Sequence, residues 1–502
     1  MELFNHLALG LSVVLSVQNL FFCFVGCFLG TAIGVLPGVG PMATIAMLLP
    51  ITYTMGPETA LIMLSGIYYG ALYGGSTTAI LINLPGESAA AVTTIDGYQM
   101  ARQGRAGPAL AVAALGSFFA GTVVTLLIAL VAIPMTKIAL SFGSHEYFAL
   151  MVLGLISSVA LASGSLLKAL GMIVLGLLLG LTGTDIYTGQ ARFTFGMIEL
   201  SDGIELVAIA VGLFGIAEIL RNMENESKEG LPSVLKIGRL MPSREDLRRS
   251  IGPVLRGTGL GAVLGVLPGG GALLSSFASY TMEKKLSKHP EEFGHGAIEG
   301  VAGPESANNA GAQSAFIPML SLGIPGNAVT ALLLGAMILQ GIAPGPNVIT
   351  QQPEMFWGLI ASMWVGNLML VLLNLPLVGL WVSMLKVPYR SLFPAIIVFC
   401  CIGVFSVHNS EFHVYQITVF GILGYLFYKL EGEPAPFILG FILGPLMEEH
   451  FRRAMIISRG DAMSFFERPI SASLLILAVV ALIAVSLPYF SKKREEVFVE
   501  ED

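Results

Sequence analysis

Two groups of polar side chains lie inside otherwise apolar stretches of this chain. Their carboxylate, amide and hydroxyl oxygens are the ligands that a hard cation prefers. Polar and ionisable residues are costly inside a membrane unless they are used, so such residues are functional candidates. The candidates for binding a coupling cation are Ser76, Thr77, Thr78, Glu305, Ser306, Asn308 and Asn309. Within this set, the amide oxygens of Asn308 and Asn309 offer a place for Na⁺.

Pro-Gly pairs lie beside both groups and offer a second kind of chemistry. Proline removes a backbone donor and glycine resists ordering, so a helix breaks there. The freed amide groups and the positive ends of half-helices suit a carboxylate substrate. The predicted substrate-binding residues are Pro37, Gly38, Gly40, Asn83, Pro85, Gly86, Glu87 and Ser88, followed in the second half by Pro268, Gly269, Gly270, Gly271, Gly323, Pro325, Gly326 and Asn327.

An internal repeat relates the two sets of residues. Residues 26–40 and 257–271 share the tetrapeptide Val-Leu-Pro-Gly and further glycines at a shift of 231 positions. At a shift of 240 positions, residues 84–87 match residues 324–327, and Tyr68-Tyr69 coincides with Asn308-Asn309. Breaks at corresponding places in two halves are the best sequence indication of a transporter binding site. We therefore expect a cation site in each half, with the carboxylate held between them.

The composition indicates the elements that must position these residues. The chain has 502 residues, of which 55% are hydrophobic and 12% are charged, and its mean hydropathy is +0.79. Soluble domains carry about 25% charged residues, so the sequence predicts an all-α integral membrane protein with about 10–12 transmembrane helices. The expected parts are a first repeat (residues 1–220), a cytoplasmic linker (221–256), a second repeat (257–450) and a C-terminal part (451–502) with a polar segment, one more span and a cytoplasmic tail.

The distribution of basic residues predicts that the repeats are inverted. Residues 1–101 and 289–385 contain no Lys or Arg. The basic loop follows the second break in the first half (Arg102 and Arg105), but it follows the first break in the second half (Lys284 and Lys285). By the positive-inside rule, equivalent loops then face opposite sides of the membrane. Arg452, Arg453 and Arg459 do not fit this count, which places them outside; an amphipathic surface segment would account for them.

Simpler readings of the same residues stay open at this point. Glycine and proline also permit tight packing and kinks, and Ser and Thr hydroxyls often bond back to their own helix. Cys23, Cys27, Cys400 and Cys401 read as small buried residues. The motifs GxxxxGK[ST], HExxH and GxSxG are absent, so the sequence suggests neither an ATP site nor an enzyme, and no cofactor is expected apart from the coupling ion.

The motifs themselves are similar to those of one transporter family. The first half contains GVLPGVGP and ALYGGSTTAILINLPGESAAAVTTIDGYQMARQGRAGPAL, and the second contains GVLPGGG and GPESANNAGAQSAFIPMLSLGIPGNAVTALLLGAM. These stretches resemble the large membrane subunit of the tripartite tricarboxylate transporters, the TctA family. The resemblance covers nearly the whole chain and weakens after about Arg390.

The resemblance implies a multi-pass secondary transporter of the bacterial inner membrane. It implies import of citrate, other tricarboxylates or related organic anions, driven by a Na⁺ or H⁺ gradient. The implied partners are a small membrane subunit of about four spans and a periplasmic solute-binding protein, and no nucleic acid is expected. The alternatives are a stand-alone organic-anion carrier or exporter of the same fold, and a channel or membrane scaffold. Which carboxylate is carried, and whether Na⁺ or H⁺ drives it, stays open.

Overall fold

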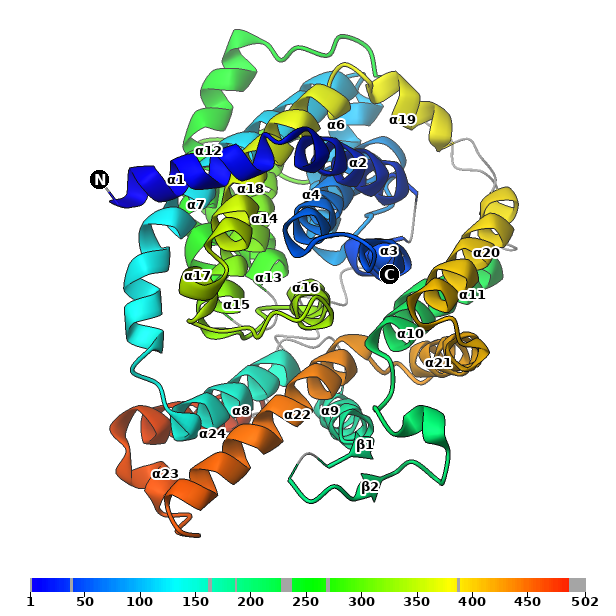
Figure 1. Ribbon diagram of the computed structural model, residues 1–502. Helices are drawn as coiled ribbons and strands as arrows, with labels where there is room; N and C mark the ends of the chain where they lie inside the picture. The colour runs from blue at the N-terminus through cyan, green and yellow to red at the C-terminus, as the bar shows by residue number, and fades with distance from the viewer. Residues whose placement is uncertain are drawn as a thin grey trace.

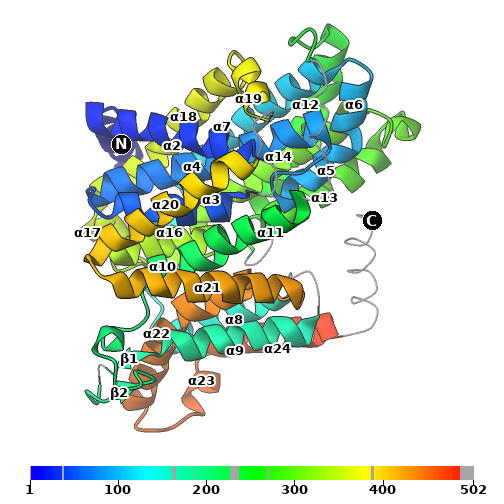
Figure 2. The same cartoon turned by 90° about the vertical axis from the view of Figure 1, so that its right-hand side faces the viewer.

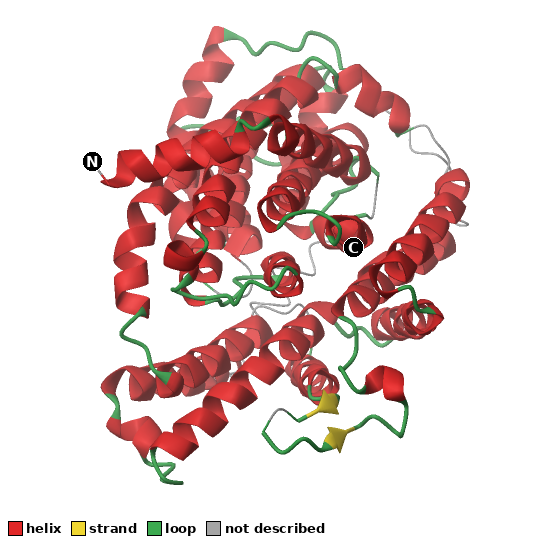
Figure 3. Cartoon of the chain, viewed as in Figure 1, coloured by secondary structure: helices red, strands yellow, loops and turns green. Residues whose placement is uncertain are grey.

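The computed structural model describes residues 2–36, 39–160, 165–185, 187–226, 237–267, 271–385 and 389–486. These residues are almost entirely helical, as Figure 3 shows. The described part contains one small sheet, in which β1 (Gly183–Thr184) pairs antiparallel with β2 (Ala191–Arg192). The predicted all-α membrane protein is therefore confirmed.

Several described helices are long and apolar enough to cross a membrane. Four regions meet this description by length and composition: Val17–Gly34, Ala106–Ala139, Leu206–Glu224 and Pro353–Asn374. Shorter apolar helices of 10–17 residues accompany them. Short apolar helices are expected where a transmembrane helix is interrupted near the middle of the membrane, because two half-helices then make up one crossing. The expected count of 10–12 crossings stays a prediction.

The first repeat contributes helices on both sides of a compact helical core (Figure 1). Its main helices are joined by breaks, and a run of short helical turns follows the second break. In chain order these elements are α1 (Glu2–Val14), α2 (Val17–Gly34), α3 (Pro41–Thr52), α4 (Pro57–Ile82), the 3₁₀ turn η1 (Ser88–Ala90), α5 (Ala91–Thr93), the π-helix η2 (Thr94–Tyr98), α6 (Gln99–Arg102) and α7 (Ala106–Ala139).

The second repeat supplies the rest of the core, and its first helix begins at Arg244, within the segment predicted as the linker (221–256). Its elements are α12 (Arg244–Leu264), α13 (Gly271–Leu286), η5 (Pro290–Glu292), α14 (Glu299–Ser314), α15 (Phe316–Leu322), α16 (Ala328–Leu339), α17 (Val348–Gln351), α18 (Pro353–Asn374) and α19 (Val378–Met384). The long helix α7 packs on α12, α14 and α18, so the two repeats interlock in the core. Capping boxes begin two of these helices, at Ser243 for α12 and at Asn327 for α16.

The remaining helices lie outside this core. They are α8 (Ser144–Ala160), α9 (Leu166–Gly180), η3 (Ile198–Leu200), α10 (Leu206–Ala210), the π-helix η4 (Val211–Ile216), α11 (Ala217–Glu226), α20 (Tyr389–His408), α21 (Glu411–Lys429), α22 (Pro434–Ile457), α23 (Ser464–Glu467) and α24 (Pro469–Ser486). In Figures 1 and 2, α8, α9, α22 and α24 lie side by side below the core, and α8 packs on both α22 and α24.

The same glycine register packs the central helices of both repeats. Gly26, Gly30 and Gly34 of α2 face the backbone of α4, where a Cβ on Gly30 would lie 2.3 Å from the carbonyl oxygen of Ile67. Gly257, Gly261 and Gly265 of α12 face α14 in the same way, and a Cβ on Gly261 would lie 2.4 Å from the carbonyl oxygen of Ala307. Ile67 and Ala307 are 240 positions apart. The sequence repeat is therefore a repeat of packing geometry, since only glycine permits so close a helix contact.

The second break of each half also has one backbone conformation. Asn83 ends α4 in the left-handed region (φ 60°, ψ 27°), and Gly323 ends α15 in the same region (φ 71°, ψ 26°). Four residues on, Glu87 and Asn327 are both extended, with φ −151° and −157°. The match of these two motifs is thus confirmed in the backbone, while the inverted orientation of the halves in the membrane stays a prediction.

Ion pairs hold two of the three arginines that do not fit the charge count. Arg452 lies at the C-terminal part of α22 and pairs with Asp185 at 3.1 Å and with Glu448 at 2.7 Å. The backbone N–H of Tyr187 and the guanidinium groups nearby hold the pKa of the Asp185 carboxyl below its ordinary value. Arg453 pairs with Glu449. Glu448 and Glu449, each one turn earlier in the same helix, thus offset the charge of these two arginines. Arg452 and Arg453 are therefore part of a long helix and not of a separate surface segment.

Candidate functional site

The carboxylate of Glu305 lies buried where the two repeats meet. Glu305 belongs to α14, and 2% of it is exposed. Ser76 on α4 donates a 2.7 Å hydrogen bond to Oε2, and the hydroxyl of Thr93 on α5 donates to Oε1. Both donors come from the first repeat. This side chain of the second repeat is therefore held by neutral hydroxyls of the first.

The amides of Asn308 and Asn309 extend this polar cluster by one helical turn. Asn308 Nδ2 donates to Glu87 Oε1 at 2.8 Å. Asn309 Nδ2 donates to the carbonyl oxygen of Ser117 on α7 at 2.5 Å. These residues share one helix, since α14 is continuous through residues 305–309. The cluster thus joins the second break of the first half to the middle of α14.

The amide oxygens of these two asparagines are left without a partner. Asn308 and Asn309 are each 2% exposed, and neither Oδ1 atom has a hydrogen-bond partner among the described residues. A buried acceptor left unsatisfied costs about 1–3 kcal/mol. Two such oxygens next to a carboxylate therefore form an arrangement that a cation or ordered water would stabilise.

A small cavity lies against this cluster. Its volume is about 20 Å³, and its polar lining residues are Tyr73, Ser76, Thr77, Ser117, Glu305, Asn308, Asn309 and Asn374. Apolar residues of α4 and α7, such as Leu72 and Ala113, close it. A cavity needs about 10–15 Å³ to hold one water molecule, whereas pockets for drug-sized ligands measure about 300–1,000 Å³. This cavity therefore has room for water or a bare cation but not for a tricarboxylate.

A positive charge would stabilise the acidic side chains of the cluster. Its acidic side chains are Glu305 and the half-buried Glu87. None of the residues that line the cavity in the described part of the chain is basic, and residues 1–101 and 289–385 contain no Lys or Arg. Buried carboxylates without a cationic partner are strongly disfavoured in their charged form. The site is suited to binding a cation or a proton.

The second break of the second half makes a related contact. Asn327 Nδ2 donates to the hydroxyl of Tyr68 at 3.5 Å. Asn327 also caps α16, because its Oδ1 accepts from the backbone N–H of Thr330 at 2.8 Å. Glu87, at the corresponding position of the repeat, makes no such side-chain cap bond. Asn327 therefore caps the N-terminus of α16, whereas the Glu87 side chain accepts a hydrogen bond from Asn308.

The structure separates the predicted cation-coupling residues into two groups. Ser76, Glu305, Asn308 and Asn309 meet in the cluster, and Thr77 lines the cavity while its hydroxyl bonds back to the Tyr73 carbonyl. Two further hydroxyls also bond back to their own helices and do not line the cavity. These are Thr78, which donates to the carbonyl of Gly75, and Ser306, which donates to that of Ala302.

The predicted substrate-binding residues at the breaks have varied surroundings. Pro37, Gly38, Pro268, Gly269 and Gly270 lie outside the described residues. Gly40 and Gly86 bring the two breaks of the first half together, since a Cβ on Gly40 would lie 3.4 Å from the Gly86 carbonyl oxygen. Asn83 and Ser88 are exposed and Pro85 is half-buried. Gly271, Gly323, Pro325 and Gly326 are buried. The polar side chains of the first-half break are thus the accessible ones.

Sequence reasoning did not identify every residue of the cluster as a candidate. Thr93 contacts Glu305, and Ser117 contributes a carbonyl oxygen to Asn309 and lines the cavity. Asn367 on α18 lies 3.4 Å from the Asn309 amide. Thr93 and Ser117 are small polar residues in apolar helices, where the usual reading is a bond to their own helix. Only their contacts with the other repeat distinguish Thr93 and Ser117 from hydroxyl residues that bond back to their own helix.

Comparisons with known proteins agree with the resemblance of the motifs. A relative from Agrobacterium vitis, described as an uncharacterized 52.8 kDa protein in the TAR-I ttuC' 3' region, is 66% identical over 502 residues and is covered in full, as is this chain. A second protein of that organism, in the TAR-II ttuC' 3' region, is 66% identical over 242 residues, which are 48% of this chain and 100% of that protein. No solved structure matches. A model of the tripartite tricarboxylate transporter TctA family matches residues 20–439, so this multi-pass membrane protein belongs to that family.

Proposed function

We propose that this chain is the large permease subunit of a secondary transporter that imports tricarboxylates or related organic anions. Membership of the TctA family supports a component of a tricarboxylate transporter. The observation that carries the proposal further is the buried cluster of Glu305, Asn308 and Asn309, which joins the repeats and has two unpartnered oxygens. Transporters of inverted-repeat folds place their sites at such interfaces.

Coupling to a cation follows from the charge of this cluster. An organic anion brought near Glu87 and Glu305 would meet two acidic side chains and no basic residue in the segments that carry them. Like charges at short range repel strongly in a low dielectric. A cation bound at Glu305 and the two asparagines removes this repulsion, so the anion binds well only with the cation present. The proposed coupling ion is Na⁺, and H⁺ bound at Glu87 or Glu305 is the alternative.

The substrate carboxylates are proposed to bind at the helix breaks. The cavity beside Glu305 is too small for an organic acid, whereas Asn83 and Ser88 are exposed and Glu87 is half-buried. The residues after this break begin new helical turns, whose free N–H groups are suited to an anion. Movement of the repeats past each other would then expose the substrate to each side in turn, as alternating access requires.

The proposed partners are a small membrane subunit of about four spans and a periplasmic solute-binding protein, in the bacterial inner membrane. Membership of a tripartite family supports partner subunits in general. A stand-alone carrier or exporter of the same fold is the competing proposal. Capture of substrate by a separate binding protein would allow uptake from dilute solution, because the carrier itself then needs only modest affinity.

Uptake by the reconstituted protein tests this proposal. The full chain, with and without its candidate partner subunits, is placed in liposomes and supplied with labelled citrate, other tricarboxylates and dicarboxylates. We expect saturable uptake that requires the binding protein and an inward Na⁺ gradient. Uptake that needs no binding protein would support the stand-alone carrier instead. Unsaturable flux that is independent of any cation gradient would indicate a channel and would overturn the proposal.

A further inference from the structure

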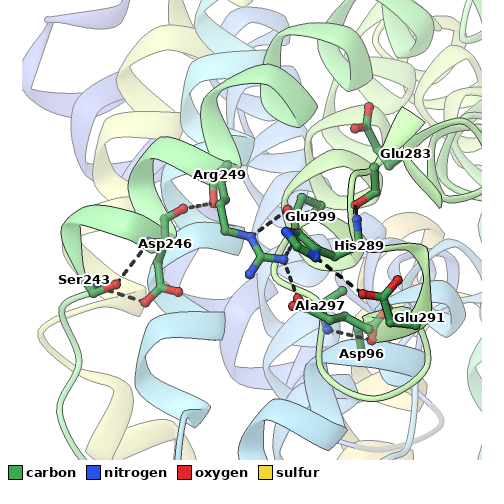
Figure 4. A network of polar contacts seen from close by, with 12 residues as sticks. Asp96, Ser243, Asp246, Arg249, Glu283, His289, Glu291, Ala297 and Glu299 are labelled. Atoms are coloured by element: carbon green, nitrogen blue, oxygen red, sulfur yellow. Dashed lines mark hydrogen bonds and ion pairs between the residues drawn. The ribbon is translucent and has the colours of Figure 1, made fainter. Parts of the chain in front are cut away.

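Asp96 is a fully buried carboxylate that is bound entirely by the opposite repeat. It lies in the π-helix η2 and is 0% exposed. Its Oδ1 accepts hydrogen bonds from the backbone N–H groups of Gly294 (2.9 Å), Gly296 (2.8 Å) and Ala297 (2.9 Å). Its Oδ2 accepts from the hydroxyl of Tyr280 at 2.9 Å. Figure 4 shows Asp96 beside Ala297, at the end of the loop that precedes α14.

The loop that holds Asp96 has a shape that only glycine permits. Gly294 and Gly296 have φ angles of +87° and +105°, which side-chain-bearing residues rarely adopt. A Cβ on Gly300 would lie 2.2 Å from Asp96 Oδ2. Backbone N–H groups of one loop that converge on one oxygen form a concave site for a negatively charged group. The loop is therefore built around the Asp96 carboxylate.

Ion pairs within the second repeat hold this loop in place. Arg249 on α12 bonds through Nε to Oε1 of Glu299 at 2.7 Å, and its Nη2 bonds to Glu292 in η5. Glu299 begins α14, directly after the loop. Figure 4 shows Arg249 between these segments. These ion pairs therefore connect the binding loop to α12 and α14.

The segment after Asp96 makes further contacts with the second repeat and with the predicted linker (221–256). Gln103 Nε2 donates to the carbonyl oxygen of His295 at 2.6 Å. Arg105 pairs with Asp246, and the backbone N–H of Gly107 donates to the carbonyl oxygen of Ile237 at 2.9 Å. These segments flank the loops whose Lys and Arg residues predict a cytoplasmic location.

The repeat has no counterpart of Asp96 in the other half. The position 240 residues later is Ala336, a buried residue of α16. The pseudo-symmetric segment therefore has no carboxylate with which to bind across the repeats. Among the described residues, this carboxylate contact therefore has no counterpart at the matching position of α16.

A short segment connects Asp96 to the cation cluster. Thr93, which donates to Glu305, lies three residues before Asp96, about one helical turn away. A π-helix begins between them at Thr94, and such irregular turns are frequent at functional sites. A change in the Glu305 contacts can displace Thr93. Because Thr93 directly precedes the π-helix that contains Asp96, such a displacement would also shift Asp96.

We propose that the hydrogen bonds of Asp96 to Tyr280 and to residues 294–297 act as a latch, which holds the two repeats together on the cytoplasmic side. Occupancy of the Glu305 cluster controls the release of this latch. The latch is closed in this structure. Release breaks the bonds to residues 294–297 and separates the segment 91–103 from the loop 287–298. This proposal rests on the proposed function in one respect, namely that the two repeats move during transport.

Hydrogen–deuterium exchange of the full chain in lipid nanodiscs tests the latch without any substrate. In Asp96→Asn we expect exchange at residues 293–298 to rise about tenfold, as loss of a charged hydrogen bond implies. Exchange should also rise at residues 89–95 and 303–309, because opening of the latch admits water to the cluster. Asp202→Asn, a change at an exposed acid of another loop, is the matched control and should leave all three segments unchanged.

Two outcomes would overturn the proposal. One is unchanged exchange at residues 293–298 in Asp96→Asn, and the other is a rise confined to that loop, which would make Asp96 a local support only. If Asp96→Asn does not fold, Tyr280→Phe removes one donor and leaves the carboxylate bound by the backbone. We then expect a smaller rise in the same three segments, and no rise there counts against the latch.

Cross-linking tests whether the latch must open during transport. Gln103→Cys and His295→Cys are combined and joined with a short, cleavable thiol cross-linker, and the single variants serve as controls. We expect the cross-linked protein to lose uptake and to regain it on cleavage. Uptake at the rate of the single variants while cross-linked would overturn the latch. If the controls transport no organic acid at all, the proposed function fails, and the exchange experiment still decides on the latch.

Discussion

Asn308 donates a 2.8 Å hydrogen bond to Glu87, and the internal repeat relates this pair to Tyr68 and Asn327, which are 3.5 Å apart. At a shift of 240, Asn308 corresponds to Tyr68 and Asn327 to Glu87. The same two positions thus meet across the repeats twice, as two-fold pseudo-symmetry requires. The two copies differ in chemistry, since only one includes a carboxylate. We therefore propose that the coupling cation binds on the side of the interface that carries Glu87.

Loss of an asparagine oxygen should weaken the cation response. In Asn308→Ala and in Asn309→Ala, we expect the Na⁺ concentration for half-maximal uptake to rise about tenfold, which corresponds to about 1.4 kcal/mol. The reason is that each change removes one unpartnered oxygen from the cluster. Ser306→Ala is the matched control, because its hydroxyl bonds to its own helix. An unchanged Na⁺ response in both Asn variants would exclude these oxygens as ligands.

The carboxylate of Glu305 should matter more than the hydroxyls that hold it. Glu305→Gln keeps the size of the side chain but removes its charge, so we expect coupled uptake to be lost. Thr93→Val removes one donor and leaves the carboxylate, so we expect reduced uptake that still requires the cation. Uptake is measured at varied Na⁺ concentration and fixed pH, and then at varied pH and fixed Na⁺ concentration. The two series show whether Na⁺ or H⁺ drives uptake. Full Na⁺-coupled uptake by Glu305→Gln would contradict the cation site.

Two glycines of α12 should respond differently to the same substitution. A Cβ on Gly261 would lie 2.4 Å from the Ala307 carbonyl oxygen, whereas a Cβ on Gly259 would meet nothing within 4 Å. We expect Gly261→Ala to lower stability by about 1–3 kcal/mol through overpacking. Gly259→Ala should leave it unchanged or raise it by up to about 1 kcal/mol, because alanine favours a helix. Thermal unfolding in one detergent compares them, and equal midpoints would contradict the packing.

The inverted orientation of the repeats can be tested by labelling. A cysteine at Tyr53, in the exposed turn after α3, should react with an impermeant reagent added outside. A cysteine at Lys285, near the end of α13, should react only from inside. The native Cys23, Cys27 and Cys400 are buried, and Cys401 is partly exposed, so the parent chain measures the background. Labelling of both positions from one face would show that the repeats are not inverted.

The amino-acid sequence by itself determined the fold class, the positions of the repeat and the residue types of the site. Apolar runs and Pro-Gly breaks are local signals, because membrane burial and broken helices depend on the residues of one segment. The glycine matches at Gly30 and Gly261 were likewise visible in the sequence, where tight packing was one of two readings left open.

Only the tertiary structure decided which of these residues act together. Thr93 and Ser117 belong to the cluster because folding brings distant helices within hydrogen-bond distance of α14. Thr78 and Ser306, of the same residue types, bond to their own helices instead. The binding of Asp96 by residues 294–297 likewise depends on a loop about 200 positions away. Such contacts leave no periodic pattern in a single sequence, since they depend on the orientation of two whole repeats.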